Sequence, residues 1–252
     1  MSKVLEAVDL CKTYVIDEWS NNVLRNVSFS MEEGEFVSIM GPSGSGKSTL
    51  LYTLSGMDSM TAGTVVFDGE DVSSMDRKGL AHLRLEKMGF IFQQMYMMKK
   101  LSIMDNVILP GFQAKHPRNE VVSRAEQLMR RLGIIETADR YMTEVSGGQL
   151  QRACLCRSLI NSPKVLFADE PTGALDQKSS MEVMRELVGA NRDGTSVLMV
   201  THSEKIASCS ERVIYLVDGC ILGEFSLGKM ESEEEMSVRE RKLRNWLEKM
   251  GW

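Results

Sequence analysis

Apolar residues in this chain gather in short runs that are separated by segments with helical periodicity. The runs are rich in β-branched and aromatic residues and are bounded by turn residues, which is typical of buried strands. Strands are expected at residues 4–10, 23–31, 36–40, 64–67, 89–92, 165–168, 196–200, 213–217 and 221–225. Helices are expected from the third strand to about residue 55, and at residues 75–87, 118–132, 147 onward, 179–190 and 204–209. Strands alternating with helices predict an α/β fold with a mostly parallel sheet.

Two regions depart from this alternation. Residues 17–22 are polar and predict a turn between the first two strands. From residue 95 to about residue 145 helical patterns dominate, with breaks expected at Pro110, Gly111 and Pro117. The pattern predicts a helical insert near the middle of the chain.

The last residues predict one more helix. The acidic run at 231–235 comes before several basic residues, an order that suits the helix dipole. One face of this helix is apolar, with members Met236, Leu243, Leu247 and Met250. Two interpretations stay open: the helix packs on its own domain, or it binds a partner.

Composition limits the class of protein. The chain has 252 residues, of which 43% are hydrophobic and 26% charged, as in an ordinary globular protein. Its apolar runs are shorter than the ~20 residues of a membrane span, and its N-terminus lacks a secretory signal. A cytosolic protein, at most peripheral to a membrane, is therefore expected. The net charge of −5 gives no basic field for nucleic acid, and the five cysteines are expected to be reduced and mostly buried.

The run Gly41-Pro42-Ser43-Gly44-Ser45-Gly46-Lys47-Ser48-Thr49 matches the phosphate-loop pattern G-x-x-x-x-G-K-[ST] at every position. It lies between a predicted strand and a predicted helix. Small residues allow several backbone N–H groups to point at one phosphate, and the helix contributes its positive N-terminus. Lys47 is expected to reach the β- and γ-phosphates, and the Ser48 hydroxyl to ligate Mg²⁺. The chain is therefore predicted to bind a nucleoside triphosphate.

A second acidic motif predicts what happens to the nucleotide. The apolar strand at residues 165–168 ends in Asp169-Glu170. At the strand tip Asp169 is expected beside the phosphate loop, where its carboxylate can hold Mg²⁺, usually through water. Glu170 can act as general base on an attacking water. Together with the phosphate loop, this pair predicts hydrolysis rather than phosphoryl transfer to a hydroxyl substrate.

The segment Val145-Ser146-Gly147-Gly148-Gln149 begins a predicted helix shortly before that strand, and it resembles the signature motif of ATP-binding cassette (ABC) ATPases. The other motifs of that family occur in its order, namely the adenine-stacking aromatic residue (Tyr14), the Q-loop glutamine (Gln93), the D-loop (Ala174-Leu175-Asp176) and the switch histidine (His202). The resemblance spans about residues 4 to 225. Val145 stands where the family usually has leucine, and Leu150 replaces a polar residue; neither change removes a group expected to touch phosphate.

The resemblance implies an α/β fold with a P-loop NTPase (RecA-like) core, an N-terminal antiparallel β subdomain and a helical subdomain specific to the family. The ABC ATPase domain is expected at 1–228, with the helical subdomain inserted at about 95–160, and a C-terminal helical extension at 229–252.

The resemblance also implies a role for each motif. Glu170, His202 and Gln93 would take part in catalysis, with His202 contacting the γ-phosphate and orienting Glu170 or the water. Mg²⁺ would be held by Ser48, Gln93 and Asp169. ATP would be bound by the phosphate loop, Tyr14, the signature residues Ser146, Gly147, Gly148 and Gln149, and Asp176.

The signature motif makes sense only with a second copy of the chain. Ser146 and the backbone N–H groups of Gly147 and Gly148 would form an anion cradle at a helix N-terminus. Known ABC architecture implies that this cradle binds the γ-phosphate held by the opposite subunit, so that two ATP molecules join two copies head to tail. Hydrolysis would remove the γ-phosphate and with it the advantage of the closed dimer.

With one cassette and no membrane span, transport would need a separate integral-membrane permease, which would place this chain at the inner face of the cell membrane. The segments 34–40, 89–93 and 168–176 resemble the macrolide-export, lipoprotein-release and bacitracin-efflux group. Export, detoxification or sensing of a peptide antibiotic-like or lipid-linked substrate is expected. Lipoprotein release, cell-division signalling and a soluble ABC ATPase are the alternatives. The soluble class is disfavoured because coiled-coil heptads, zinc-type cysteine sets and a basic patch are missing from the sequence.

Methionines are concentrated just after Gln93, in the segment Gln94-Met95-Tyr96-Met97-Met98. Methionine is flexible and polarizable, which suits a groove that must re-pack around a partner's helix. The alternative is that these side chains fill the core of their own lobe.

Overall fold

We describe the chain from a computed structural model, in which residues 2–16, 19–173 and 175–252 are described. They form two compact units: the first comprises Met1–Leu80 with Ser196–Trp252, and the second Ala81–Thr195. These bounds are wider than the helical insert expected at about 95–160, and the domain division drawn from the sequence stays a prediction.

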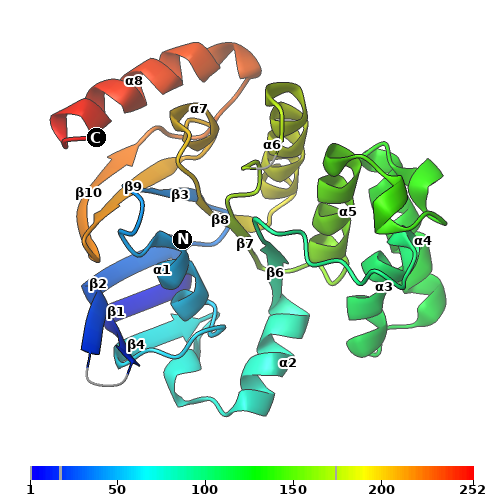
Figure 1. Ribbon diagram of the computed structural model, residues 1–252, viewed down its shortest axis with the longest axis horizontal. Helices are drawn as coiled ribbons and strands as arrows, with labels where there is room; N and C mark the ends of the chain where they lie inside the picture. Colours follow the sequence, from blue (N-terminus) through cyan, green and yellow to red (C-terminus); the bar gives the residue numbers. More distant parts are fainter. Residues whose placement is uncertain (1, 17–18, 174) are drawn as a thin grey trace. The chain divides into compact units, whose positions relative to one another are not determined.

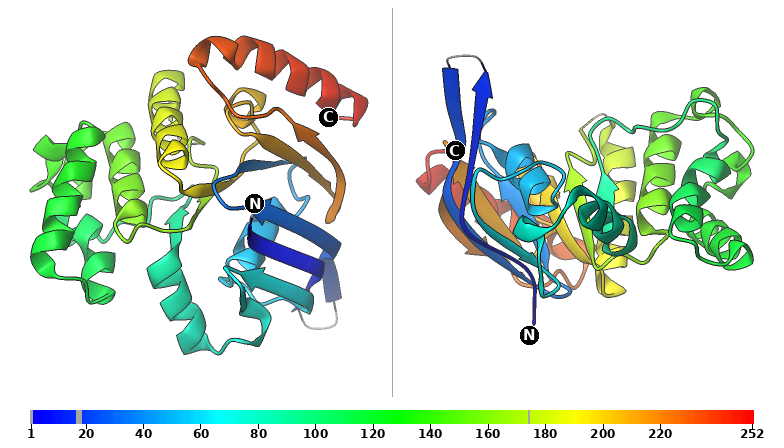
Figure 2. Two further views of the ribbon diagram at one scale, coloured as in Figure 1. Left: turned by 180° about the vertical axis from the view of Figure 1, so that it is seen from behind. Right: turned by 90° about the horizontal axis from the view of Figure 1, so that it is seen from below.

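An antiparallel sheet in the first unit has the strand order β2-β1-β4-β5. Its bounds are β1 Lys3–Ile16, β2 Trp19–Glu32, β4 Ala62–Phe67 and β5 Glu70–Asp71. Figure 2 shows β1 and β2 (blue) as a long two-stranded ribbon. The turn predicted at residues 17–22 is too long, because residues 19–22 continue β2 and pair with β1. Asp17 and Glu18 lie outside the described residues. Backbone pairing, such as Tyr14 with Asn21, overrides the polar composition there.

The other strands of the first unit follow the order β10-β9-β3-β8. The buried strand β3 (Phe36–Met40) is parallel to β8 (Ser196–Val200) and to β9 (Arg212–Val217), whereas β10 (Cys220–Ser226) is antiparallel to β9. Helix α1 (Lys47–Leu54) follows β3, and the short α7 (Glu204–Ala207) connects β8 to β9. Each of these strands was predicted from the sequence to within one residue.

Helix α8 (Met236–Lys249) packs on the first unit through its apolar face. Leu243 and Leu247 are fully buried in a core cluster with Met40, Ala207, Val213 and Tyr215. Figure 1 shows the helix (red) running beside β9, β10 and α7. Packing on its own domain, one of the two interpretations left open by the sequence, is therefore confirmed.

A buried arginine fastens the same helix. The Arg239 guanidinium is almost inaccessible to solvent and donates to backbone carbonyl groups at residues 208, 210, 227 and 228. A buried cation is costly unless its donors are satisfied, and here neighbouring carbonyl oxygens satisfy them. Burial lowers the pKa of Arg239.

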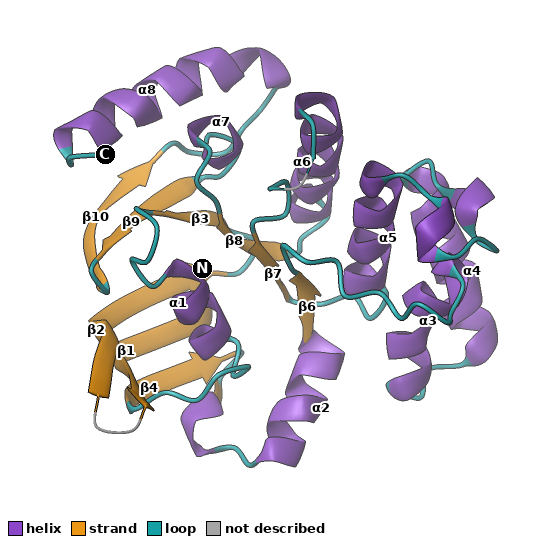
Figure 3. Ribbon diagram, in the orientation of Figure 1, coloured by secondary structure: helices purple, strands orange, loops and turns teal. Residues whose placement is uncertain are grey.

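The second unit contains the strands β6 (Met88–Ile91) and β7 (Val165–Asp169), which pair in parallel. Its helices are α3 (Ile103–Gln113), α4 (Arg118–Arg131), α5 (Gly147–Leu159) and α6 (Gln177–Arg192), and α2 (Arg77–Lys87) leads into β6. Figure 3 shows the helices α3, α4 and α5 grouped together (purple). Short 3₁₀ turns occur at Val72–Ser74, Ile135–Thr137, Met142–Glu144 and Glu233–Glu235.

The helix break predicted at Pro110 and Gly111 is wrong, because α3 runs through both residues. Proline lacks the amide hydrogen that a helix interior uses, and it usually kinks or ends a helix. At Gly111 a β carbon would lie 2.6 Å from a methyl carbon of Val121, so glycine allows α3 and α4 to approach closely. Tertiary contact therefore outweighs local propensity here.

Within the described residues, no helix is both long enough and apolar enough to cross a membrane.

Leu247→Ala should lower the free energy of unfolding by about 2–5 kcal/mol, because it leaves a cavity under α8. Val238→Ala, at an exposed position of the same helix, should change it by no more than about 0.5 kcal/mol. Equilibrium unfolding in urea measures both. If the urea unfolding curves of the two variants had the same midpoint and slope, burial of Leu247 would not stabilise the protein.

Candidate functional site

The phosphate loop leaves the end of β3 and enters α1 through tight turns. A β carbon at Gly41 would lie 1.9 Å from the carbonyl oxygen of Leu216, so only glycine fits there. Gly46 has a φ of 99°, in the region that favours glycine, and it caps α1. The close approach of Gly41 to β9 thus helps to shape the phosphate loop.

Lys47 is 6% exposed, and its ammonium lies inside the loop. It donates to the carbonyl oxygens of Gly41 at 2.9 Å and of Pro42 at 2.8 Å. These contacts hold a positive charge at the N-terminus of α1, whose first turn carries no acidic residue. Both features favour an anion at this end of the helix.

Two further details fit a phosphate group. The Ser45 hydroxyl is buried and has no hydrogen-bond partner among the residues that the structure describes. The solvent side of the loop is open at Gly44, where a β carbon would meet nothing within 4 Å. The residues present therefore match the predicted nucleotide-binding loop.

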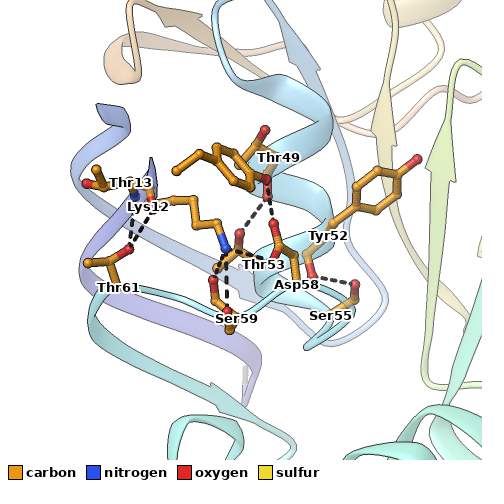
Figure 4. A network of polar contacts seen from close by, with 10 residues as sticks. Lys12, Thr13, Thr49, Tyr52, Thr53, Ser55, Asp58, Ser59 and Thr61 are labelled. Carbon is orange, nitrogen blue, oxygen red and sulfur yellow. Dashed lines mark hydrogen bonds and ion pairs between the residues drawn. The ribbon is translucent and has the colours of Figure 1, made fainter. Parts of the chain in front are cut away.

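Tyr14, the predicted adenine-stacking residue, is held by its hydroxyl group. The Tyr14 O–H donates to Asp58 Oδ2 at 2.5 Å, and Asp58 Oδ1 accepts from the Lys12 ammonium at 2.6 Å. Figure 4 shows this polar network, in which Lys12 from β1 meets Asp58 and Ser59 beyond the end of α1. The Tyr14 ring is 39% exposed, so a ligand can reach it.

Lys12 and Asp58 were missed by the sequence reasoning. Lys12 carries a weak signal, since it lies two residues from Tyr14 and therefore on the same face of β1. Asp58 carries none, because it is 44 residues away from Tyr14 and belongs to no motif.

His202 lies exposed in the segment between β8 and α7. Because β8 is parallel to β3, the carboxyl ends of both strands meet at one edge. The phosphate loop follows β3 at this edge, and the Thr201 N–H donates to the Ile39 carbonyl at 3.2 Å. The first unit thus brings together the phosphate loop, Tyr14 and the segment of His202.

Asp169 and Glu170 end the buried strand β7 in the second unit. Asp169 is buried as the last residue of the strand, and Glu170 follows with a φ of 47°. A glutamate in this left-handed region is uncommon and is typical of functional sites. The Glu170 carbonyl accepts from the Gly173 N–H at 3.0 Å, which closes a turn. Gln93 borders this turn, with its amide nitrogen 3.7 Å from where a β carbon of Gly173 would lie.

The signature residues begin helix α5. The Ser146 hydroxyl accepts from the Gln149 N–H at 3.3 Å, and the Gln149 side chain accepts from the Ser146 N–H at 3.0 Å. This capping box leaves Ser146 and Gly147 exposed, with the helix N-terminus toward solvent. The same helix is tied to the Glu170 turn, because Gln151 donates to the Pro171 carbonyl at 2.7 Å.

Asp176 is the N-cap of α6. Its carboxylate accepts from the backbone N–H groups of Lys178 and Ser179 and from the Ser179 hydroxyl. The hydrogen bonds from Ser179 hold the pKa of Asp176 below its ordinary value. Ala174, part of the predicted D-loop, lies outside the described residues. The second unit thus holds Gln93, Asp169 and Glu170 around one turn, joined through α5 to the signature motif.

The methionine segment after Gln93 divides into buried and exposed residues. Met97 is 7% exposed and belongs to the core of its own unit, whereas Met98 is 55% exposed. Arg157 of α5 fixes the backbone by donating to the carbonyl groups of Met95 and Tyr96. A partner groove here would therefore use Met98 and the exposed Tyr96, and not Met97.

The cysteines match the expectation of buried, reduced thiols. All five are free, three of them buried, and burial raises the pKa of Cys154 to about 11 and that of Cys156 to about 12. Both thiols are therefore protonated at neutral pH and unreactive.

Comparison with known proteins shows the family. A family model described as ABC transporter matches residues 24–173, more than half of the chain. The chain is 41% identical over 226 residues to the lipoprotein-releasing system ATP-binding protein LolD of Aquifex aeolicus, which covers 90% of this chain and 99% of that protein. It is 40% identical over 226 residues to the bacitracin export ATP-binding protein BceA of Halalkalibacterium halodurans, with 89% of each covered.

A longer relative is the macrolide export ATP-binding/permease protein MacB of Chlorobium luteolum. It is 40% identical over 221 residues, which are 88% of this chain and 33% of MacB. Among solved structures, the dimeric ATP-binding cassette MJ0796 bound to ADP and Pi matches with a TM-score of 0.84 at 37% identity, over 90% of this chain and all of that one.

The chain therefore belongs to the ABC transporter family of ATP-binding proteins. Its fold is that of an ABC ATPase cassette, a mixed α/β structure with an antiparallel sheet and helical elements, as the sequence predicted. It is an ATP-hydrolysing protein of the kind found in the macrolide-export, lipoprotein-release and bacitracin-export systems.

Proposed function

We propose that this chain powers a separate membrane permease by hydrolysing ATP between two copies of itself. The preformed phosphate loop is the observation that carries this proposal. Its glycine turns, its buried Lys47 and the positive N-terminus of α1 suit the phosphates of a nucleotide. Tyr14 would stack on adenine.

The second unit would supply Glu170, the proposed general base, with Gln93 beside it. His202, from the first unit, would contact the γ-phosphate. Ser48, Gln93 and Asp169 offer hydroxyl, amide and carboxylate oxygens, which are ligands that Mg²⁺ accepts together with phosphate oxygens. Bound Mg²⁺ would neutralise charge that develops on the phosphates. These residue assignments extend the family resemblance to this chain.

The exposed signature motif supports a head-to-tail dimer. Its capping box keeps the first turn of α5 ordered while the N–H groups of Gly147 and Gly148 stay available for an anion. A γ-phosphate presented by a second copy would complete this cradle, with Asp176 near the dimer contact. MJ0796, which resembles this chain, is dimeric with ADP and Pi bound.

A permease partner is supported by the relatives. LolD is named for lipoprotein release, BceA for bacitracin export and MacB for both an ATP-binding and a permease part. We infer that this chain serves export, detoxification or sensing of a peptide antibiotic-like or lipid-linked substrate, with mechanotransmission such as lipoprotein release as the second candidate. The chain would then lie at the inner face of the cell membrane, and Met98 and Tyr96 would face the permease.

Glu170→Gln should lower ATP turnover by roughly 10²-fold or more, because the amide cannot take the proton from water. ATP binding should persist, and the variant should accumulate as an ATP-dependent dimer on a sizing column. Phosphate release under steady-state conditions measures the turnover. Near wild-type hydrolysis by Glu170→Gln would rule out this base.

Ser146→Arg should abolish ATP-driven dimerisation, because its long side chain fills the anion cradle of the signature motif. The affinity of the monomer for ATP should stay unchanged, since the phosphate loop is intact. Dimerisation is measured by light scattering in the Glu170→Gln background, and affinity by titration. Ser146→Ala is the matched control, because it removes the hydroxyl and the helix cap without filling the cradle. It should still dimerise, more weakly than the wild type, through the N–H groups of Gly147 and Gly148. A loss of monomer affinity in Ser146→Arg would place Ser146 in the site of its own subunit instead.

A further inference from the structure

Lys12 is a charged residue in a buried position on β1. It is 5% exposed, and its ammonium donates to Asp58 Oδ1 at 2.6 Å and to the Ser59 carbonyl at 2.5 Å. Burying an ammonium costs free energy unless it is paired. The turn after α1 supplies that pairing, so β1 and this turn form one polar unit (Figure 4).

Asp58 is shared between two partners. One carboxylate oxygen accepts from Lys12 and the other from the Tyr14 hydroxyl at 2.5 Å. Burial raises the pKa of Asp58, but the hydrogen bonds from Lys12 and Tyr14 and the charge of Lys12 lower it more, to a net value below the ordinary one. Asp58 is therefore ionised at neutral pH. Burial and the hydrogen bond to Asp58 raise the pKa of Tyr14, which keeps its hydroxyl protonated as the donor.

Asp58 lies just beyond the C-terminal end of α1, the helix that follows the phosphate loop. Its N–H donates to the Tyr52 carbonyl of that helix at 3.1 Å. Through Asp58, the Tyr14 hydroxyl is thus tied to the end of the helix that follows the phosphate loop.

The Tyr14 ring is also fixed through one of its faces. The Lys12 nitrogen lies 4.6 Å from the ring centroid, within cation–π distance. A planar base can then stack on the face of the Tyr14 ring that lies opposite Lys12. The ring needs no reorientation when the base arrives, so binding does not have to restrict this side chain.

We propose that Asp58 and Lys12 are positioning residues for the adenine base: they hold the Tyr14 ring in a stacking orientation and join it to the end of the helix that follows the phosphate loop. This inference rests on the proposed nucleotide site. It separates base recognition, which depends on the network, from phosphate recognition, which depends on the loop.

Asp58→Asn and Tyr14→Phe test this separation. Tyr14→Phe keeps the ring and removes only the anchoring hydroxyl. Each variant should weaken ATP binding about 3- to 10-fold, the range expected when one side chain must be ordered on binding. Neither should change the affinity for inorganic tripolyphosphate, which has no base. The double variant should bind ATP no more weakly than Asp58→Asn alone, because Asp58→Asn already disrupts the hydrogen bond that Tyr14→Phe removes.

Isothermal titration of wild-type and variant chains with ATP and with tripolyphosphate measures these affinities. Asp71→Asn is the matched control: Asp71 also caps a turn of the first unit, through Ser73, but does not touch Tyr14. It should change neither affinity. If Asp58→Asn lowered the affinities for ATP and for tripolyphosphate equally, Asp58 would only support the phosphate loop. If Tyr14→Phe left the affinity for ATP unchanged, the Tyr14 hydroxyl would not position the ring. Either result overturns the proposal. If the wild-type chain bound neither ligand, the nucleotide site itself would be wrong.

Discussion

The close approach of backbone to backbone at Gly41 is the constraint on which the rest of the structure depends. The chain leaves β3 so near the Leu216 carbonyl that no side chain fits, and the Gly219 N–H then donates to the Ser45 carbonyl at 3.0 Å. The strand β9 and the turn that follows it therefore shape the phosphate loop. A loop shaped in advance keeps its donors in place, so a phosphate meets them without further ordering of the backbone.

The constraint extends to residues far from the loop. Met40, directly before Gly41, is buried in the cluster that Leu243 and Leu247 of α8 complete, and Met40 pairs with Tyr215 of β9. The helix α1, which follows the loop, is joined at its C-terminal end to β1 through the network around Asp58. The C-terminal helix thus packs against the strand that enters the loop, and the first strand is tied to the helix that leaves it, although α8, Lys12 and Asp58 belong to no motif that defines the family.

The sequence predicted the strands, the phosphate loop and the signature helix because each rests on local rules. A phosphate loop needs glycines and a lysine at set positions, and a buried strand needs a run of apolar residues. The continuation of α3 through Pro110 could not be predicted in this way, since it depends on contact with α4. The link between Lys12 and Asp58 joins residues 46 positions apart, and Arg157 contacts the sulfur of the buried Met97 from 60 positions away. Such features arise from the packing of segments that are distant in sequence, which a single sequence does not reveal.

The central claim is that this loop binds ATP through Lys47. The most direct test is the thermal stabilisation of the chain by ATP, compared between the wild type and Lys47→Met. Lys47→Met can change the melting temperature of the protein even without ATP. The comparison therefore uses the difference in melting temperature with and without ATP for each protein. At an ATP concentration of 100 times Kd, the wild type should gain about 2.7 kcal/mol of stability, and Lys47→Met should gain almost none. An equal shift in both proteins would contradict the claim.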